Sequence, residues 1–180
     1  TKSGGNYKVG RIGYGSFNTR DVQAAAGFDK DGFSQNYAVT YQASDGYRDH
    51  SESEKAGFSG KWFYSPDNGG SRYGLIVRHH ESKAEEPGFL TFAESRTNWR
   101  QSRPHNATDE GRRQLSQVAL QSETVLGNQM FWTAQAYYNA IDDKRYLRFT
   151  AASNQQERIT RENQLGVGTT LTWRPAPTSI

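Results

Sequence analysis

The stretch from Gln114 to Ala140, QLSQVALQSETVLGNQMFWTAQAYYNA, alternates apolar with polar or small residues. Val118 and Leu120 set the apolar positions, and the alternation resumes after Gly127-Asn128. Successive side chains leave a pleated strand on opposite sides, so this period of two predicts two strands joined by a tight turn. A hairpin of this kind either buries its apolar face in a core or turns that face outward to lipid, as a transmembrane barrel does.

The composition favours the transmembrane barrel. Only 33% of the 180 residues are hydrophobic and the mean hydropathy is -0.93, yet 13% are aromatic. Disorder would explain the low hydrophobicity but not the aromatic content. A barrel explains both, because half of each strand faces a wet interior and aromatic residues gather at the membrane interfaces. No apolar run is long enough for a transmembrane helix, which does not exclude a membrane protein.

Charge and cysteine usage exclude several functions. The chain has no cysteine, so disulfides, thiolate metal sites and thiol catalysis are excluded. The net charge of +3 is spread along the chain rather than concentrated in one patch, and we expect no nucleic-acid partner. The opening TKSGG is not a signal peptide, so we expect the sequence to begin within a longer protein.

About eight strands are expected from the alternation. Tight turns are predicted at Asp29–Gly32 and Pro66–Gly70, where Asp, Pro and Gly favour reversals. Longer polar connections are predicted at Ser44–Glu54, Ser82–Gly111 and Asp142–Arg158. Besides the two strands of 114–140, the expected strands are 7–17, 21–28, 33–43, 56–64, 72–77 and 165–173.

The connections alternate in length along the chain. Short reversals follow Phe28, Tyr64 and Leu126, whereas long connections follow Ala43, His80 and Ala140, with the turn at Asn18 as the exception. Outer-membrane barrels have short periplasmic turns and longer outer loops, so this parity predicts a membrane barrel. The aromatic residues near the short turns fit an interfacial girdle, namely Phe28, Trp62, Tyr64, Trp132 and Trp173. The edges expected to touch hydrocarbon carry Val39, Trp62, Leu75, Trp132 and Val167.

Three segments carry a family resemblance. The opening TKSGG resembles the end of the plug domain of TonB-dependent outer-membrane receptors, where a strand ends in Thr-Lys. GRIGYGSFNTRDVQAAAG is similar to the first barrel hairpin of that family, and SDGYRDHSESEKAGFSGKWFYSP resembles its early loop with the following strand and turn. The resemblance implies a plug end at 1–5 and the N-terminal portion of the β-barrel domain at 6–180.

The resemblance implies a fold and partners. The fold class is all-β, an antiparallel transmembrane β-barrel segment of about eight strands from a larger, 22-stranded barrel filled by a plug. The implied function is uptake of a ferric siderophore or a similar scarce nutrient across the outer membrane, without catalysis. The implied partners are that ligand, outer-membrane lipid and lipopolysaccharide, and the TonB complex through a plug region that this sequence lacks.

The loop FLTFAESRTNWRQSRPHNATDEGRR is the candidate ligand-binding region. Ferric siderophores are often anionic and rich in oxygen, so guanidinium groups and an aromatic face suit them. A solvated loop, or one that meets lipopolysaccharide phosphates, is the alternative. The candidate contacts are Arg96, Trp99, Arg100, Arg103 and His105.

No metal or catalytic site is predicted. His79 and His80 are neighbours in a strand and point to opposite faces, and His50 lies near Asp45 and Asp49 in a loop. Asp142-Asp143 lacks the spacing of a calcium loop, so a turn is expected there. No catalytic motif is present and we expect neither a cofactor nor an enzyme. The alternative to a receptor segment is a complete eight-stranded barrel with a structural or adhesive role, which predicts that the first and last strands pair.

Overall fold

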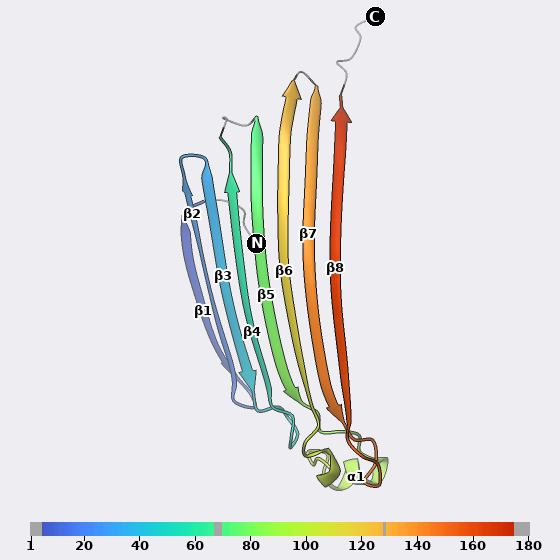
Figure 1. The fold of residues 1–180 in the computed structure, drawn as a ribbon. Helices are drawn as coiled ribbons and strands as arrows, with labels where there is room; N and C mark the ends of the chain where they lie inside the picture. The colour runs from blue at the N-terminus through green and yellow to red at the C-terminus, as the bar shows by residue number, and fades with distance from the viewer. Residues whose placement is uncertain (1–4, 67–69, 128, 175–180) are drawn as a thin grey trace, which may run out of the picture.

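The protein forms one antiparallel sheet with the strands in sequence order (Figure 1). The computed structural model describes residues 5–66, 70–127 and 129–174. Residues 1–4 of the expected plug end, and parts of the turns expected at 66–70 and 127–128, lie outside that range. The strands are β1 Tyr7–Gly15, β2 Thr19–Lys30, β3 Phe33–Ser44, β4 Ser53–Tyr64, β5 Ser71–Glu85, β6 Glu110–Gly127, β7 Met130–Leu147 and β8 Gln156–Trp173.

The sheet is open. In the described residues β1 pairs only with β2, and β8 pairs only with β7. Val9 therefore has Ala25 as its strand partner and Val167 has Ala136, and the two valines do not pair with each other. A closed barrel would need β1 and β8 to pair, so the complete eight-stranded barrel is not favoured.

The two faces of the sheet differ in polarity. The register places Trp62, Leu75, Leu120, Ala136 and Val167 in one row across five strands, and we call this side the apolar face. These side chains do not interlock in a dry interior, since Leu120 is 55% exposed and Val167 is 79% exposed. In the described residues Ile76, at 8% exposure, is the one buried large hydrophobic residue. The predicted outward apolar edges are thus on a common, accessible surface.

The opposite side, here called the polar face, carries a row of hydrogen-bonded side chains across β5 to β8. The Arg78 guanidinium donates to Gln117 Oε1 at 2.7 Å, and Gln117 Nε2 donates to Asn139 Oδ1 at 2.9 Å. Asn139 Nδ2 then donates to Gln164 Oε1 at 3.2 Å. Because every link passes a donor to the next acceptor, the row satisfies these amides and fixes the register of four strands.

The strands extend further than the alternation predicts at the end of the sheet where the longer connections lie. Residues 82–85 belong to β5 and 110–111 to β6, so the connection is 86–109 rather than Ser82–Gly111. The turn expected at Asp142-Asp143 is wrong, because both residues lie in β7 and pair with Gln114 and Arg113. The connection expected at Asp142–Arg158 is reduced to 148–155, and that at Ser44–Glu54 to 45–52. Both faces are polar here, so no apolar period marks the strands, and cross-strand ion pairs stabilise them.

The turn between β2 and β3 is the tight reversal that the sequence predicts, narrowed to two residues. Lys30 pairs with Phe33, and the intervening Asp31 and Gly32 have φ values of 50° and 76°. Positive φ at both central residues is the type I′ geometry, whose twist matches that of the flanking strands. Asp and Gly are among the residues that adopt this conformation most readily.

Within residues 5–66, 70–127 and 129–174, helical structure is confined to the 86–109 connection. It holds helix α1 (Phe92–Thr97) and the single 3-10 turn Pro104–Asn106, neither of which the sequence pattern predicts. Across the residues described, no helix has both the length and the apolarity needed to cross a membrane.

Candidate functional site

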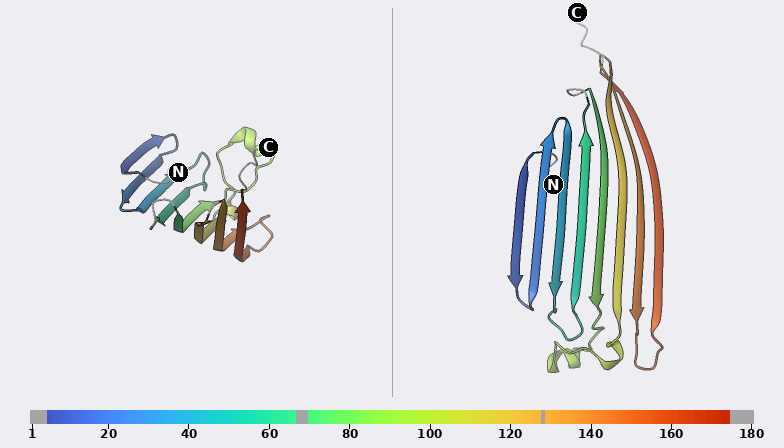
Figure 2. Two further views of the ribbon diagram at one scale, coloured as in Figure 1. Left: turned by 90° about the horizontal axis from the view of Figure 1, so that it is seen from above. Right: turned by 60° about the vertical axis from the view of Figure 1, so that its left-hand side comes forward.

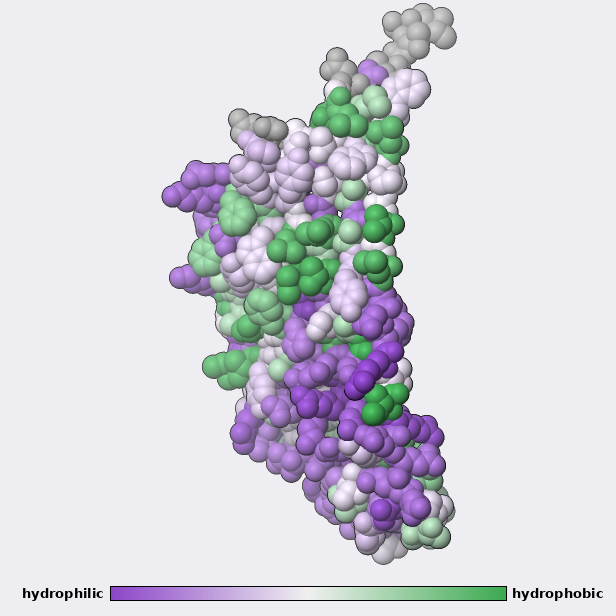
Figure 3. Space-filling view, viewed as in Figure 1, coloured by the Kyte–Doolittle hydropathy of each residue, from purple (hydrophilic) through white to green (hydrophobic). Residues whose placement is uncertain are grey.

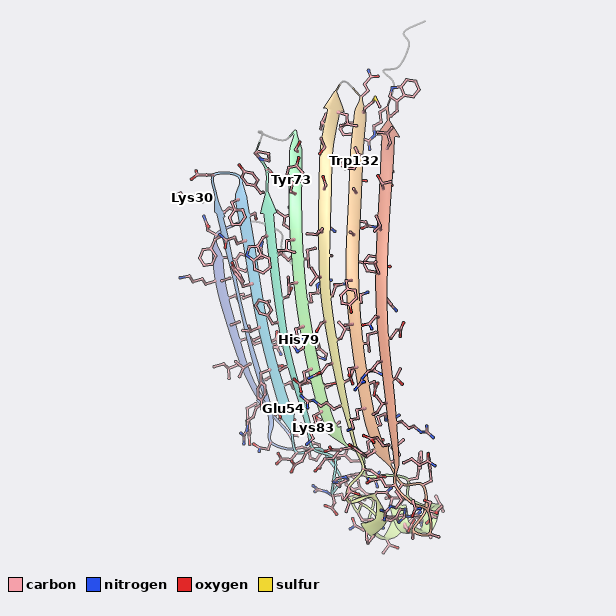
Figure 4. The ribbon with its side chains drawn as sticks, viewed as in Figure 1. Lys30, Glu54, Tyr73, His79, Lys83 and Trp132 are labelled. Atoms are coloured by element: carbon pink, nitrogen blue, oxygen red, sulfur yellow. The ribbon has the colours of Figure 1, made fainter. Side chains whose placement is uncertain are left out.

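A band of apolar and aromatic residues crosses the apolar face on the half nearer the short turns (Figure 3). On β7 the apolar-face positions run from Met130 to Ala140, with Trp132 close to the turn. At about 3.3 Å per residue and a tilt of about 45°, this run covers roughly 23 Å of height, close to the roughly 25 Å band of an outer-membrane barrel. Figure 4 shows Tyr73 and Trp132 near the turn end of this face, with His79 further toward the loops.

Charged residues replace the apolar ones on the same face nearer the loops, where Figure 4 labels Glu54 and Lys83. On β5, Val77 is followed on this face by His79, Glu81 and Lys83. The charges are paired across strands, as Lys83–Glu110 at 3.1 Å, Arg112–Glu81 at 2.5 Å, Lys144–Glu157 at 2.6 Å and Arg161–Asp142 at 3.2 Å. In membrane barrels, lipid-facing charges are costly at mid-depth and tolerated near the interface, and the apolar band and paired charges of this face follow the same order.

The 86–109 connection, here called the cap, covers the end of the sheet at which the longer connections lie. Figure 2 (left) shows α1 and its connection to one side of the sheet. Glu86 turns to the polar face, where its carboxylate accepts two hydrogen bonds from Arg145 at 2.9 and 2.7 Å. The loop therefore lies toward the side of the amide row, away from the apolar band.

Arg48, from the 45–52 connection, holds the cap in place. Its guanidinium donates to the carbonyl oxygens of Gly88 at 2.8 Å, Pro87 at 3.2 Å and Gln101 at 2.8 Å. The Asp49 amide also donates to the Arg100 carbonyl at 2.7 Å. A planar guanidinium can reach several acceptors at once, so this one side chain joins both ends of the 86–109 connection to the 45–52 connection.

Asp109 anchors the other side of the cap. It is 2% exposed, and its carboxylate accepts from Asn106 Nδ2 at 2.8 Å, the Arg148 amide at 2.8 Å and Gln155 Nε2 at 3.0 Å. Its carbonyl lies 2.7 Å from His50 Nε2. A buried carboxylate needs such donors, and here they come from the 148–155 connection and from within the cap itself.

Arg103 is occupied within the loop. It binds the Glu94 carboxylate with two donors, Nε at 3.1 Å and Nη2 at 2.5 Å. Glu94 also accepts from the Thr91 amide and hydroxyl, which completes a capping box at the start of α1. The Arg103 bonds, and then those from Thr91, lower the pKa of Glu94 from 4.5 to about 2. Arg103 therefore has a structural partner in this arrangement.

Trp99 and Arg100 lie on an exposed aromatic surface formed by three connections. The Trp99 ring stacks on Tyr47, with centroids 6.0 Å apart and planes 20° apart, and Tyr47 meets Phe17 edge-on at 6.5 Å. The Arg100 guanidinium carbon is 5.9 Å from the ring centres of both Phe17 and Trp99. All three rings remain about half exposed. We call Phe17, Tyr47, Trp99 and Arg100 the aromatic surface.

The five candidate residues thus do not form one cluster. Trp99 and Arg100 belong to the aromatic surface, Arg96 lies beside Phe92 on α1 at 5.6 Å, and Arg103 and His105 line a separate hollow. The sequence interpretation missed Arg48, Tyr47 and Asp109. Their partners are 40 or more positions away in most cases, so no local spacing identifies them. The one local signal for a binding site was the grouping of cationic and aromatic residues in the 86–109 connection.

The histidines do not converge on a metal site. His79 Nδ1 lies 2.9 Å from Ser116 Oγ on the apolar face, and His80 is on the polar face. His50 Nδ1 lies 3.4 Å from a carboxylate oxygen of Glu85 on β5. Among the residues that the structure covers, no group of three or more His, Asp or Glu side chains is arranged to hold a metal ion.

Sequence comparisons give no relative. No protein-family model and no curated protein matches the chain.

Solved structures do resemble this fold. One is the siderophore receptor PiuA from Acinetobacter baumannii, with a TM-score of 0.79 and 14% identity over 97% of this chain and 28% of that one. Another is the ferric citrate transporter FecA in its unliganded form, with a TM-score of 0.68 and 18% identity over 90% of this chain and 24% of that one. This chain spans about a quarter of each of these proteins. It is therefore an all-β, open eight-stranded antiparallel sheet with the fold of one segment of a siderophore-receptor barrel.

Proposed function

We propose that this chain is the N-terminal barrel portion of a TonB-dependent outer-membrane receptor that takes up a ferric siderophore or a similar scarce nutrient. The observation that carries the proposal is the overlap of nearly the whole open sheet with part of a siderophore receptor. The apolar band and the charged rows beyond it support the same assignment. Binding and transport, without catalysis, are the proposed activities.

The proposed surroundings follow from the two faces. The apolar band contacts outer-membrane hydrocarbon, and the paired charges beyond it lie at the level of lipopolysaccharide. The polar face lines the barrel interior, next to the plug through which the TonB complex acts. The open edges of β1 and β8 pair with further strands of the receptor, because unpaired backbone groups in lipid cost several kcal/mol each.

The proposed ligand contact is the aromatic surface. Trp99 and Tyr47 offer stacked rings, and the Arg100 guanidinium between Trp99 and Phe17 offers donors to anionic oxygen atoms. Arg103 contributes indirectly, since its bonds to Glu94 fix the loop that carries both residues. Arg96 and His105 remain candidates at the edge of the cap, the latter in the separate hollow.

A binding assay tests this proposal. The protein, purified from membranes in detergent, is dialysed to equilibrium against radioactive ferric complexes of a hydroxamate, a catecholate and a carboxylate siderophore. We expect saturable binding of at least one complex, and a loss of about tenfold or more in affinity for Trp99→Ala and for Arg100→Gln. Phe92→Ala is the matched control, because Phe92 is 78% exposed on the same loop but outside the aromatic surface. Binding of none of the three complexes would contradict the receptor assignment.

A further inference from the structure

Three cations lie on the polar face in the middle of the sheet. Lys55 and Lys61 belong to β4, and Arg78 of β5 lies opposite Ser59, on the same side as the amide row. At about 3.3 Å per residue, this register sets Arg78 about 13 Å along the strands from Lys55 and about 7 Å from Lys61. We call Lys55, Lys61 and Arg78 the basic row.

The basic row is not neutralised by the protein. In the part of the chain that the structure describes, no carboxylate lies within ion-pair distance of its three members. Among the described residues of β3 to β6, Glu123 is the one carboxylate on this face, and it lies opposite Arg72 nearer the short turns. Arg113 on the same face already binds Asp143 of β7. The middle of the face therefore carries uncompensated positive charge.

A hollow of about 200 Å³ opens beside Arg78. Its lining on the polar face has no acidic residue and includes Ile76, Arg78, Gln117, Gln121, Gln135 and Tyr137. Arg78 is exposed, and within the residues described its guanidinium makes one hydrogen bond, from Nη1 to Gln117 Oε1 at 2.7 Å. A guanidinium has five donors, so the others are accessible to a ligand in the hollow. The glutamine amides and the Tyr137 hydroxyl add neutral donors.

We propose that the ligand that this protein takes up carries a net negative charge and binds to the basic row, with one oxygen-rich group in the hollow at Arg78. The inference rests on the proposed uptake function and adds to it the charge class of the ligand and a contact separate from the aromatic surface. Guanidinium and ammonium groups bind oxyanions through charge-assisted hydrogen bonds. A wall of one charge sign also raises the local concentration of a ligand of the opposite sign.

The three ferric complexes of the binding assay test the charge class on the detergent-purified protein. The catecholate and carboxylate complexes are anionic, and the hydroxamate complex is chosen as an uncharged trihydroxamate. At about 50 mM salt we expect an anionic complex to bind about tenfold more tightly than the neutral one. Raising the salt to about 500 mM should weaken the anionic complex about tenfold, because salt screens accessible charges, and should leave the neutral one unchanged.

A triple variant separates the basic row from the aromatic surface. Lys55→Gln, Lys61→Gln and Arg78→Gln together should lower the affinity for the anionic complex about tenfold at low salt and remove most of its salt dependence. The matched control removes three cations of the apolar face instead, Lys8→Gln, Lys30→Gln and Arg161→Gln. The control should keep both the affinity and the salt dependence. The wild-type salt series provides a separate test if the triple variant does not fold.

The outcomes distinguish this inference from the uptake proposal. Binding of the neutral complex alone would leave the uptake proposal standing and reject the anionic ligand. An anionic complex that binds equally to the triple variant and to the control, or that does not respond to salt, would reject the basic row as its site. Failure of all three complexes to bind would reject both proposals.

Discussion

Trp62 covers Gly60 so closely that the glycine has no room for a side chain. A Cβ at position 60 would lie 2.3 Å from the indole ring. The ring is held by a 2.9 Å hydrogen bond from its Nε1 to the Tyr37 hydroxyl and by edge-on contact with the Tyr37 ring. An aromatic ring over a strand glycine supplies the packing that the glycine lacks, and it pins the register.

Gly60→Ala should therefore destabilise the protein. Overpacking of this kind costs about 1–3 kcal/mol, because the ring must leave its place or the backbone must shift. Urea unfolding in detergent micelles measures the change. Gly10→Ala is the matched control, since the nearest atom to its Cβ is 3.9 Å away. Equal free energies of unfolding for the two variants would show that Trp62 does not hold position 60.

The Glu94 carboxylate makes the cap sensitive to acid. Its pKa of about 2 is below its ordinary 4.5, so the ionised form favours the folded loop. This contribution is complete above about pH 4.5 and is lost as the pH falls from there through about 2. Hydrogen exchange protection of the Thr91 amide, which donates to Glu94, should be flat near neutral pH and should fall over that window. Glu94→Gln should remove the dependence, and a wild-type protection factor that is constant down to pH 2 would contradict it.

The cap is an element held by its neighbours rather than by its own helix. α1 has six residues, none of them buried, and isolated helices of that length are not stable in water. Arg48 and Asp109 supply the missing stabilisation from the adjoining connections. The aromatic surface depends on the same contacts, because Tyr47 and Trp99 come from the two connections that Arg48 joins.

Arg48→Met should release the cap without unfolding the sheet. Losing about 1.4 kcal/mol of local stability would raise the open population about tenfold. Chymotrypsin, which cuts after aromatic residues, should then cleave the 86–109 connection about tenfold faster. The control is Arg11→Met, because that side chain is 73% exposed on β1 and far from the cap in the sequence. An unchanged cleavage rate for Arg48→Met would show that the Arg48 hydrogen bonds do not hold the 86–109 connection in place.

At the scale of the whole molecule, the two faces of one strand predict opposite responses to charge. Leu120 lies in the apolar row of β6, and the next residue, Gln121, lies on the polar face. Leu120→Arg should cost about 2–4 kcal/mol of folding free energy in lipid vesicles, as expected for arginine at the bilayer midplane. Gln121→Arg should cost much less, because that face is polar. If Gln121→Arg is the more damaging variant, the assignment of the lipid-facing side is reversed.

The sequence by itself determined which residues share a face and where the tight turn between β2 and β3 lies. Alternation in β3, β6 and β7 predicted the apolar and polar sides, since side-chain direction in a strand follows directly from position. Asp31-Gly32 predicted its turn because few other residue pairs adopt that backbone geometry. The long connection that carries Trp99 and Arg100 was also predicted from its polar composition.

The tertiary structure decided how far the strands extend and how the loop end is assembled. Beyond the apolar band both faces meet a polar environment, so no period marks β5 to β8 there, and cross-strand charges such as Arg113–Asp143 become visible only once the strands are paired. Arg48 and Asp109 acquire their roles from contacts with residues distant in the sequence. Such contacts leave no local pattern, because they depend on loop paths that only the assembled sheet brings together.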